Sequence, residues 1–113
     1  MAKPRLTWQE SFNPRINIKN IKTPGRWMSY LAINYADSVW KKIDTATKKG
    51  DLGYRSKISS PIFSLDNKRA YCVLYVYTYD CHNQDDILRV REELKNLGFV
   101  RPINYTTKNL FII

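Results

Sequence analysis

The sequence predicts an α+β fold in which two helices pack on the same face of a mixed or mostly antiparallel sheet. Residues 69–80 alternate in character with a period of two, as in a strand with two different faces. Residues 36–49 and 84–97 carry apolar side chains three and four positions apart, as in helices that bury one face each. One sheet side can bury both helices, which leaves the other side of the sheet open.

The amino-terminal segment, residues 1–24, is predicted to be a basic, extended arm that precedes a single α+β domain at residues 25–113. Pro4, Pro14 and Pro24 interrupt any helix there. The first 26 residues hold six Lys or Arg residues against one acidic residue, and such a bias attracts polyanions. A solvated arm without a specific partner is the alternative. The residues expected to contact nucleic acid are Arg15, Lys19, Lys22 and Arg26.

The middle of the chain predicts a strand, a helix and a second strand. Residues 26–33 follow a Pro-Gly turn and alternate as a strand does. The helix at 36–49 should end at Gly50, after two lysines that suit the negative end of the helix dipole. Residues 52–59 are short and alternating, which indicates another strand, with Arg55 and Lys57 on the face opposite Tyr54.

The second half predicts a hairpin, a helix and two short final strands. A loop from Ser60 leads into the strand at 69–80, and together they resemble a hairpin. Asn83 is a good N-cap for the helix at 84–97, which should end at Gly98. The segment 99–113 alternates loosely, as two short strands would.

The strand at 69–80 carries the strongest functional indication. Its Cys72, Leu74 and Val76 suit the core, while four tyrosines lie on the opposite face of a protein with a net charge of +9. Phenol rings near basic groups suit stacking on bases and hydrogen bonding to phosphates. In the alternative, the arm folds over this face and Trp8 or Phe12 covers the tyrosines. The predicted ligand-binding residues are Trp27, Arg55, Lys57, Tyr75 and Tyr77.

Composition excludes several classes of protein. The chain has 113 residues, enough for one core, and lacks the run of about 20 apolar residues that a membrane span needs. No secretory signal is recognisable, so a cytoplasmic location with reduced Cys72 and Cys81 is expected. The single histidine, His82, rules out a multi-histidine metal site, and the sequence predicts neither a metal ion nor a cofactor. No catalytic pattern is recognisable either, and the oligomeric state stays open.

Five short blocks occur in order along residues 24–113: Gly25–Met28, Val39–Ile43, Gly50–Gly53 with Ser56–Ser59, Val76–Asp80, and Asp86–Leu94 with Gly98. Together they resemble the domain of unknown function 1917, the Bles-type family. The resemblance implies the fold of the translation initiation factor 4E superfamily, a curved, mostly antiparallel sheet backed by helices. In that superfamily the concave face binds a methylated cap through aromatic stacking and basic contacts to phosphates. Trp27 and Lys57 match positions of the Bles-type blocks.

Three functional hypotheses follow from these observations. The first is a small basic binding module for a nucleotide, a phosphate-bearing ligand or a single-stranded nucleic acid. The second is a protein-interaction module or inhibitor, for example a phage or virus counter-defence protein, that docks on an acidic or nucleic-acid-binding partner. The third is a lysine-dependent enzyme acting on a phosphorylated substrate, with Lys57 and His82 as its reactive groups. Binding without catalysis is favoured, and no membrane partner is expected.

Overall fold

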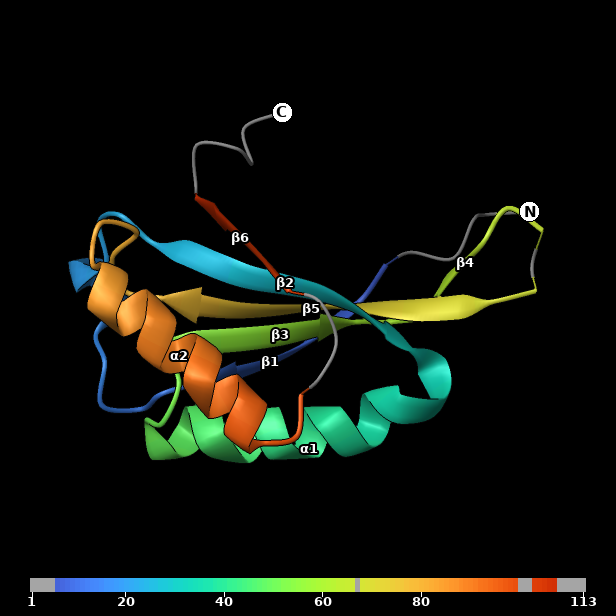
Figure 1. The fold of residues 1–113 in the computed structure, drawn as a ribbon, viewed down its shortest axis with the longest axis horizontal. Coiled ribbons are helices and arrows are strands. Elements are labelled where there is room, and N and C mark those ends of the chain that lie inside the picture. The colour runs from blue at the N-terminus through green and yellow to red at the C-terminus, as the bar shows by residue number, and fades with distance from the viewer. Residues whose placement is uncertain (1–5, 67, 100–102, 108–113) are drawn as a thin grey trace.

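The computed structural model describes residues 6–66, 68–99 and 103–107, and these form an open antiparallel sheet with two α-helices (Figure 1). The helices are α1 (Ile33–Lys49) and α2 (Gln84–Asn96), and a short 3₁₀ helix, η1, spans Ile18–Asn20. None of the described helices has the length and apolar character that crossing a bilayer would require. The strands are β1 (Trp8–Phe12), β2 (Gly25–Ala32), β3 (Arg55–Ser59), β4 (Ile62–Phe63), β5 (Ala70–Thr78) and β6 (Asn104–Thr107).

The sheet is built around the long strand β5. Its main path runs β1-β3-β5-β2-β6, and the two-residue strand β4 also pairs with β5. All these pairings are antiparallel, and a single parallel bridge joins Thr23 to Asp80 beside the start of β2. Strands that are far apart in sequence therefore lie side by side, with the amino-terminal β1 next to β3.

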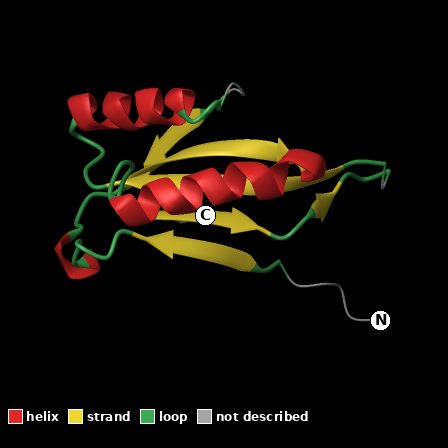
Figure 2. Ribbon diagram, turned by 90° about the horizontal axis from the view of Figure 1, so that it is seen from below, coloured by secondary structure: helices red, strands yellow, loops and turns green. Residues whose placement is uncertain are grey.

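Both α-helices pack on one face of this sheet, as the sequence predicts (Figure 2). Ile43 of α1 and Leu94 of α2 join Leu74 and Val76 of β5 in one buried cluster. Burying such aliphatic side chains contributes roughly 1.5–3 kcal/mol each. The predicted helix end is confirmed at Gly50, whose φ of 87° lies in the left-handed region that glycine adopts readily.

The two helices begin in different ways: α2 has a side-chain N-cap, and α1 has none. Asn83 caps α2, since its side chain accepts a hydrogen bond from the backbone N–H of Asp86. Helix α1 begins at Ile33, three residues earlier than predicted, because the alternation of β2 ends at Ala32. Asp37 therefore lies beyond the first turn of α1.

The amino-terminal segment belongs to the sheet. Residues 8–12, expected in an arm outside the domain, form the edge strand β1 and pair with all five residues of β3. Ser11, which is 1% exposed, donates a hydrogen bond to the backbone oxygen of Asp44 in α1. Proline spacing excluded a helix here but could not reveal a strand whose partner lies more than 40 positions away. Of the two predicted final strands, β6 is present, and the second falls outside the described residues.

Candidate ligand-binding face

The sheet face opposite the helices carries two rows of side chains. Residues paired directly across strands point to the same side, so the pairing register defines each row. We call these two rows, together with Trp8, the open face. The first row, from β1 to β6, is Phe12, Arg55, Tyr77, Arg26 and Thr106, and the second is Glu10, Lys57, Tyr75, Met28 and Asn104.

Arg26 lies against two tyrosine rings of the open face. Its guanidinium carbon is 3.7 Å from the ring centre of Tyr75 and 6.0 Å from that of Tyr77. Its Nη1 also donates a hydrogen bond of 3.4 Å to the hydroxyl of Tyr77. Cation–π contacts of this kind contribute about 0.5–1 kcal/mol at exposed sites and more when desolvated. The rings therefore hold the guanidinium group in one orientation.

Lys57 and Arg55 are held in the same way on the neighbouring strand β3. The ammonium of Lys57 is 4.3 Å from the ring centre of Trp8 and 5.5 Å from that of Tyr75. The guanidinium of Arg55 is 5.2 Å from the ring centre of Tyr77, and it forms an ion pair with Glu10. Since Glu10 is the one acidic residue in the two rows, the three cations leave a net positive charge on this face.

Four of the five predicted ligand-binding residues lie together on the open face. These are Arg55, Lys57, Tyr75 and Tyr77. The fifth, Trp27, lies on the opposite face, is 7% exposed, and donates a hydrogen bond of 3.1 Å from Nε1 to the backbone oxygen of Ile87. Its indole ring packs edge-on against Tyr105 at 5.0 Å. Trp27 is therefore part of the core, because the alternation of β2 turns Arg26 toward the open face instead.

The tyrosine rings support the cations more than they present free surfaces. Tyr77 is only 9% exposed, and its ring contacts that of Tyr54 at 5.8 Å. Tyr75 is half-buried between the guanidinium of Arg26 and the indole of Trp8, which lies 5.5 Å away. The predicted alternative, in which Trp8 covers the tyrosines, is thus realised in part. The groups best placed to contact a ligand are the cations.

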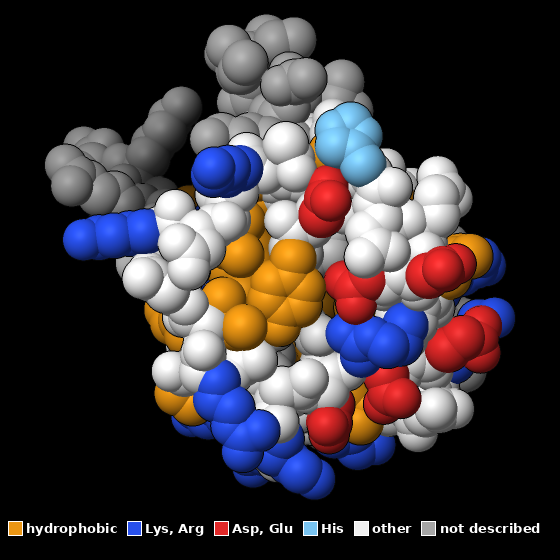
Figure 3. All heavy atoms as spheres, turned by 90° about the vertical axis from the view of Figure 1, so that its left-hand side faces the viewer, with side chains coloured by type: hydrophobic (Ala, Val, Ile, Leu, Met, Phe, Trp, Pro, Cys, Tyr) orange, Lys and Arg blue, Asp and Glu red, His pale blue; other side chains and the backbone are white. Residues whose placement is uncertain are grey.

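A hollow of about 350 Å³ lies at one end of the open face. This volume falls within the usual range of small-molecule sites, roughly 300–1,000 Å³. Figure 3 shows this end of the molecule, where hydrophobic side chains gather in a patch with Lys and Arg groups to its left and below and Asp and Glu side chains to its right. The hollow is lined by Ile18, Ile21, Pro24, Gly25, Arg26, Tyr54, Arg55 and Tyr77.

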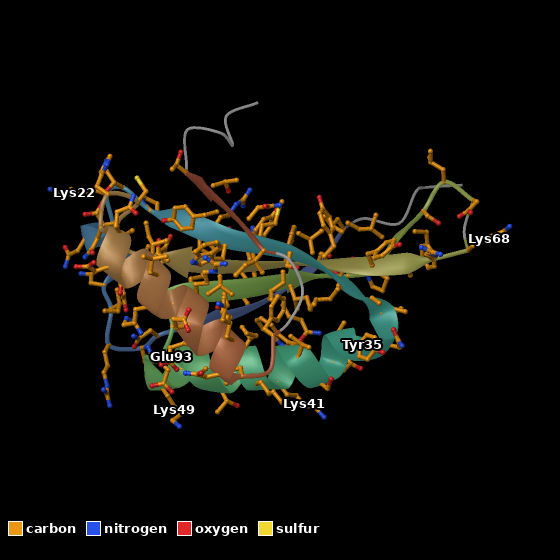
Figure 4. All side chains as sticks on the ribbon, in the orientation of Figure 1. Lys22, Tyr35, Lys41, Lys49, Lys68 and Glu93 are labelled. Atoms are coloured by element: carbon orange, nitrogen blue, oxygen red, sulfur yellow. The ribbon has the colours of Figure 1, made fainter. Side chains whose placement is uncertain are left out.

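The basic residues predicted to contact nucleic acid reach this end of the sheet. Arg15, Lys19 and Lys22 are exposed, and Lys22 projects from the end of the molecule at which β2 begins (Figure 4). Arg26 lies inside the open face and lines the hollow. Of these four residues, Arg26 is therefore held in place by contacts within the sheet, whereas the other three are exposed.

Tyr54 lines the hollow, although the alternation of residues 52–59 placed it on the face opposite Arg55. Strand β3 begins only at Arg55, so Tyr54 precedes the strand and does not follow its alternation. The adjacent Gly53 allows this path, because a Cβ there would lie 1.6 Å from the backbone oxygen of Tyr77. The only feature of the sequence that indicated this position of Tyr54 is the glycine that directly precedes it, Gly53.

Tyr54 predicts a loss of stability in alkaline solution. Burial, with a further contribution from the neighbouring phenol of Tyr77, raises the pKa of Tyr54 from 10.0 to about 12. The unfolded chain then releases this proton at a lower pH than the folded protein, so stability present below pH 10 is lost as the pH rises toward 12. Relative to Tyr54→Phe, the wild type should lose about 2 kcal/mol across this interval, measured by urea denaturation. An identical pH dependence of the two proteins would contradict the assignment.

The fold and the open face together define a small α+β protein with an aromatic and basic sheet surface. Residues 17–111 match the family of the basophilic leukemia-expressed protein Bles03, and the chain belongs to this family. No curated protein matches the chain. The family match begins after β1, so Trp8, Glu10 and Phe12 of the open face precede the matched residues.

Proposed function

We propose that the protein is a binding module for phosphate-bearing ligands, namely nucleotides or single-stranded nucleic acid, which it binds on the open face. The observation that carries the proposal is the placement of Arg26, Arg55 and Lys57 over tyrosine and tryptophan rings, with Glu10 as their one acidic neighbour. Cations that are already oriented lose little entropy when they bind phosphate oxygens.

The hollow supports a ligand with both an anionic and an apolar part. Arg26 and Arg55 line it beside Tyr54, while Ile18 and Ile21 form an apolar side. A phosphate group can accept hydrogen bonds from the guanidinium groups, because a planar guanidinium matches the spacing of phosphate oxygens. The apolar side can cover a base or sugar. The exposed Lys19 and Lys22 then extend the contact along a nucleic-acid backbone.

We also propose that the fold is of the initiation factor 4E type, which is supported by the antiparallel sheet and by the two helices on one of its faces. A clamp of two tryptophans around a methylated base does not fit this chain. Trp27 and Trp40 pack with the helices, and Trp8 lies alone among the tryptophans on the open face. The proposed ligand is therefore recognised mainly through its phosphates.

Replacing Lys57 with glutamine tests the proposed function. The affinity for a labelled single-stranded RNA and for ATP should fall about tenfold or more, since a hydrogen bond to a charged group contributes about 1.5–3 kcal/mol. For RNA, the salt dependence of binding should also weaken by about 0.7 in logarithmic slope, as expected for one lost phosphate contact. Fluorescence titration at two salt concentrations measures both effects.

Lys41→Gln is the matched control, because it removes the same charge from an exposed position on α1, which projects away from the sheet (Figure 4). The control should keep nearly the full affinity. Equal losses in the two variants would indicate attraction by net charge alone, without a site on the open face. Absence of saturable binding at low salt would remove the proposal.

A second candidate function, protein interaction, is supported by exposed apolar side chains near the β4–β5 turn. Phe63 is 63% exposed and Leu65 is fully exposed, while Ile62 is 40% exposed. Groups of exposed apolar residues often mark contacts with other proteins. Affinity capture from a nuclease-treated lysate separates the two candidates, since only a direct protein partner survives the treatment.

A further inference from the structure

Three successive residues that differ in chemistry bring their ligand atoms together where the chain leaves β5. One carboxylate oxygen of Asp80, the thiol sulfur of Cys81 and one ring nitrogen of His82 all lie within 4.8 Å of one another. Asp80 and Cys81 are partly exposed and His82 is exposed, so solutes can reach all three. Sequence spacing did not reveal the group, because familiar metal motifs separate their ligands by two or more residues.

The donor set is one that a particular class of metal ion prefers. Sulfur, imidazole nitrogen and carboxylate oxygen are all ligands of Zn²⁺, at roughly 2.0–2.3 Å, in a tetrahedral arrangement. Hard ions such as Mg²⁺ and Ca²⁺ prefer oxygen alone. Ligand atoms in a tetrahedral zinc site lie about 3–4 Å apart. Small rotations of the three side chains would bring their ligand atoms from the present separations, all within 4.8 Å, to that spacing.

Hydrogen bonds fix the backbone of this turn, and they leave the side-chain ligand atoms able to bind a metal ion. Asp80 Oδ1 accepts hydrogen bonds from the hydroxyl of Thr23, at 2.8 Å, and from the backbone N–H of His82, at 2.9 Å. The backbone N–H of Cys81 donates to the oxygen of Thr23 at 2.7 Å. Both bonds to Asp80 end on Oδ1, and the second carboxylate oxygen gives the residue further acceptor capacity. The side chains therefore start close to a binding arrangement.

The local charge also favours a cation, although the whole chain is basic. Asp80 supplies a carboxylate within the group itself, and hydrogen bonds from the hydroxyl of Thr23 and the backbone N–H of His82 orient it. Asp85 lies in the first turn of α2, a few residues further on, and the neighbouring Asp86 forms an ion pair with Arg89 at 3.0 Å. Figure 3 shows an Asp or Glu side chain directly beside the histidine, and further acidic side chains on that side of the view that lie among Lys and Arg groups.

We propose that Asp80, Cys81 and His82 bind a divalent transition-metal ion of the Zn²⁺ type, with a fourth position left to water or another ligand. The proposal does not depend on phosphate binding, since it uses none of the cations of the open face. The bound ion would hold the loop between β5 and α2 in one conformation, because all three ligands lie in that loop, and binding to the folded form would stabilise the protein.

Titration of the untagged, reduced protein with Zn²⁺, followed by calorimetry, tests the proposal. One saturable site per chain is expected, together with a rise in melting temperature. Co²⁺ should give the near-ultraviolet absorption of a thiolate-to-cobalt charge transfer, which reports directly on Cys81. Cys81→Ser and His82→Gln should each weaken Zn²⁺ binding by about 10–100-fold or more, because even loss of an indirect supporting contact has an effect of that size.

Asp66→Asn is the matched control for Asp80→Asn. Asp66 also lies in a turn, where it accepts hydrogen bonds from the hydroxyl of Ser64 and from the backbone N–H of Lys68, two residues on. Only Asp80→Asn should weaken Zn²⁺ binding. The proposal is overturned if the wild type shows no saturable site, if Cys81→Ser and His82→Gln bind as tightly as the wild type, or if Asp66→Asn weakens binding equally.

Discussion

Replacing Trp27 with alanine is expected to lower the free energy of unfolding by about 3–5 kcal/mol, the usual cost of removing a large buried aromatic side chain. The indole is 7% exposed and contacts the ring of Tyr105. It also donates the hydrogen bond that ties β2 to the backbone of Ile87 in α2. Because a domain of this size is usually stable by only about 5–15 kcal/mol, the loss is a large share of the total. Urea denaturation followed by circular dichroism measures it.

Trp27→Phe separates a structural role of Trp27 from a role in binding. Phenylalanine keeps an aromatic ring in the core but cannot donate to Ile87, so a smaller loss of stability is expected. The affinity for ATP or RNA should stay unchanged, since the indole lies on the helix-covered face of the sheet. Weaker ligand binding by Trp27→Phe, at a temperature where the variant is fully folded, would show that Trp27 contacts the ligand.

Replacing Gly53 with alanine is expected to destabilise the protein by about 3 kcal/mol, at the upper end of what forced overpacking costs. A Cβ at this position would lie 1.6 Å from the backbone oxygen of Tyr77 and 2.8 Å from its carbonyl carbon. Both atoms belong to the central strand β5 and cannot move without disturbing its pairing with β2 and β3. The variant should also bind phosphate-bearing ligands less tightly, because Tyr54 and Arg55 would shift relative to Tyr77.

Gly98→Ala provides the comparison for Gly53→Ala. Gly98 has a φ of 90°, so alanine there carries backbone strain of about 1–2 kcal/mol. The nearest atom to its added Cβ is the Lys42 ammonium nitrogen at 3.9 Å, which leaves enough space. Thermal and urea denaturation should therefore rank Gly53→Ala as the more damaging substitution. If Gly98→Ala proved the more damaging substitution, the segment at Gly53 would be able to move away from Tyr77 of β5 at little cost in stability.

Local patterns in the sequence were sufficient for the helices and for the face assignment of β5. Ile43 and Leu94 lie in the core because apolar side chains at helical spacing can be buried on only one side of a helix. Gly50 ends α1 and Asn83 begins α2, and both boundaries depend only on capping interactions within a few residues. Leu74 and Val76 face the helices, as the alternation of β5 requires. The grouping of Arg55, Lys57, Tyr75 and Tyr77 on one face also followed from alternation in two neighbouring strands.

The remaining features depend on contacts between distant segments. β1 pairs with β3 across more than 40 residues, and this pairing places Trp8 over Lys57 and Glu10 beside Arg55. Alternation fixes which residues of a strand share a face, but it does not say which of the two faces the helices will cover. For β2, the helices cover the side that carries Trp27, which turns Arg26 toward Tyr75 and Tyr77.

The α+β class, the two amphipathic helices and the tyrosine-bearing strand follow from the order of residues along the chain, because each depends on interactions among neighbours. The composition of the open face, the position of Trp27 in the core and the meeting of residues 18–24 with Tyr54 around one hollow follow from the folded arrangement alone. These outcomes depend on strand register and on packing between segments far apart in sequence, where the free energy belongs to the assembled sheet and not to any one segment.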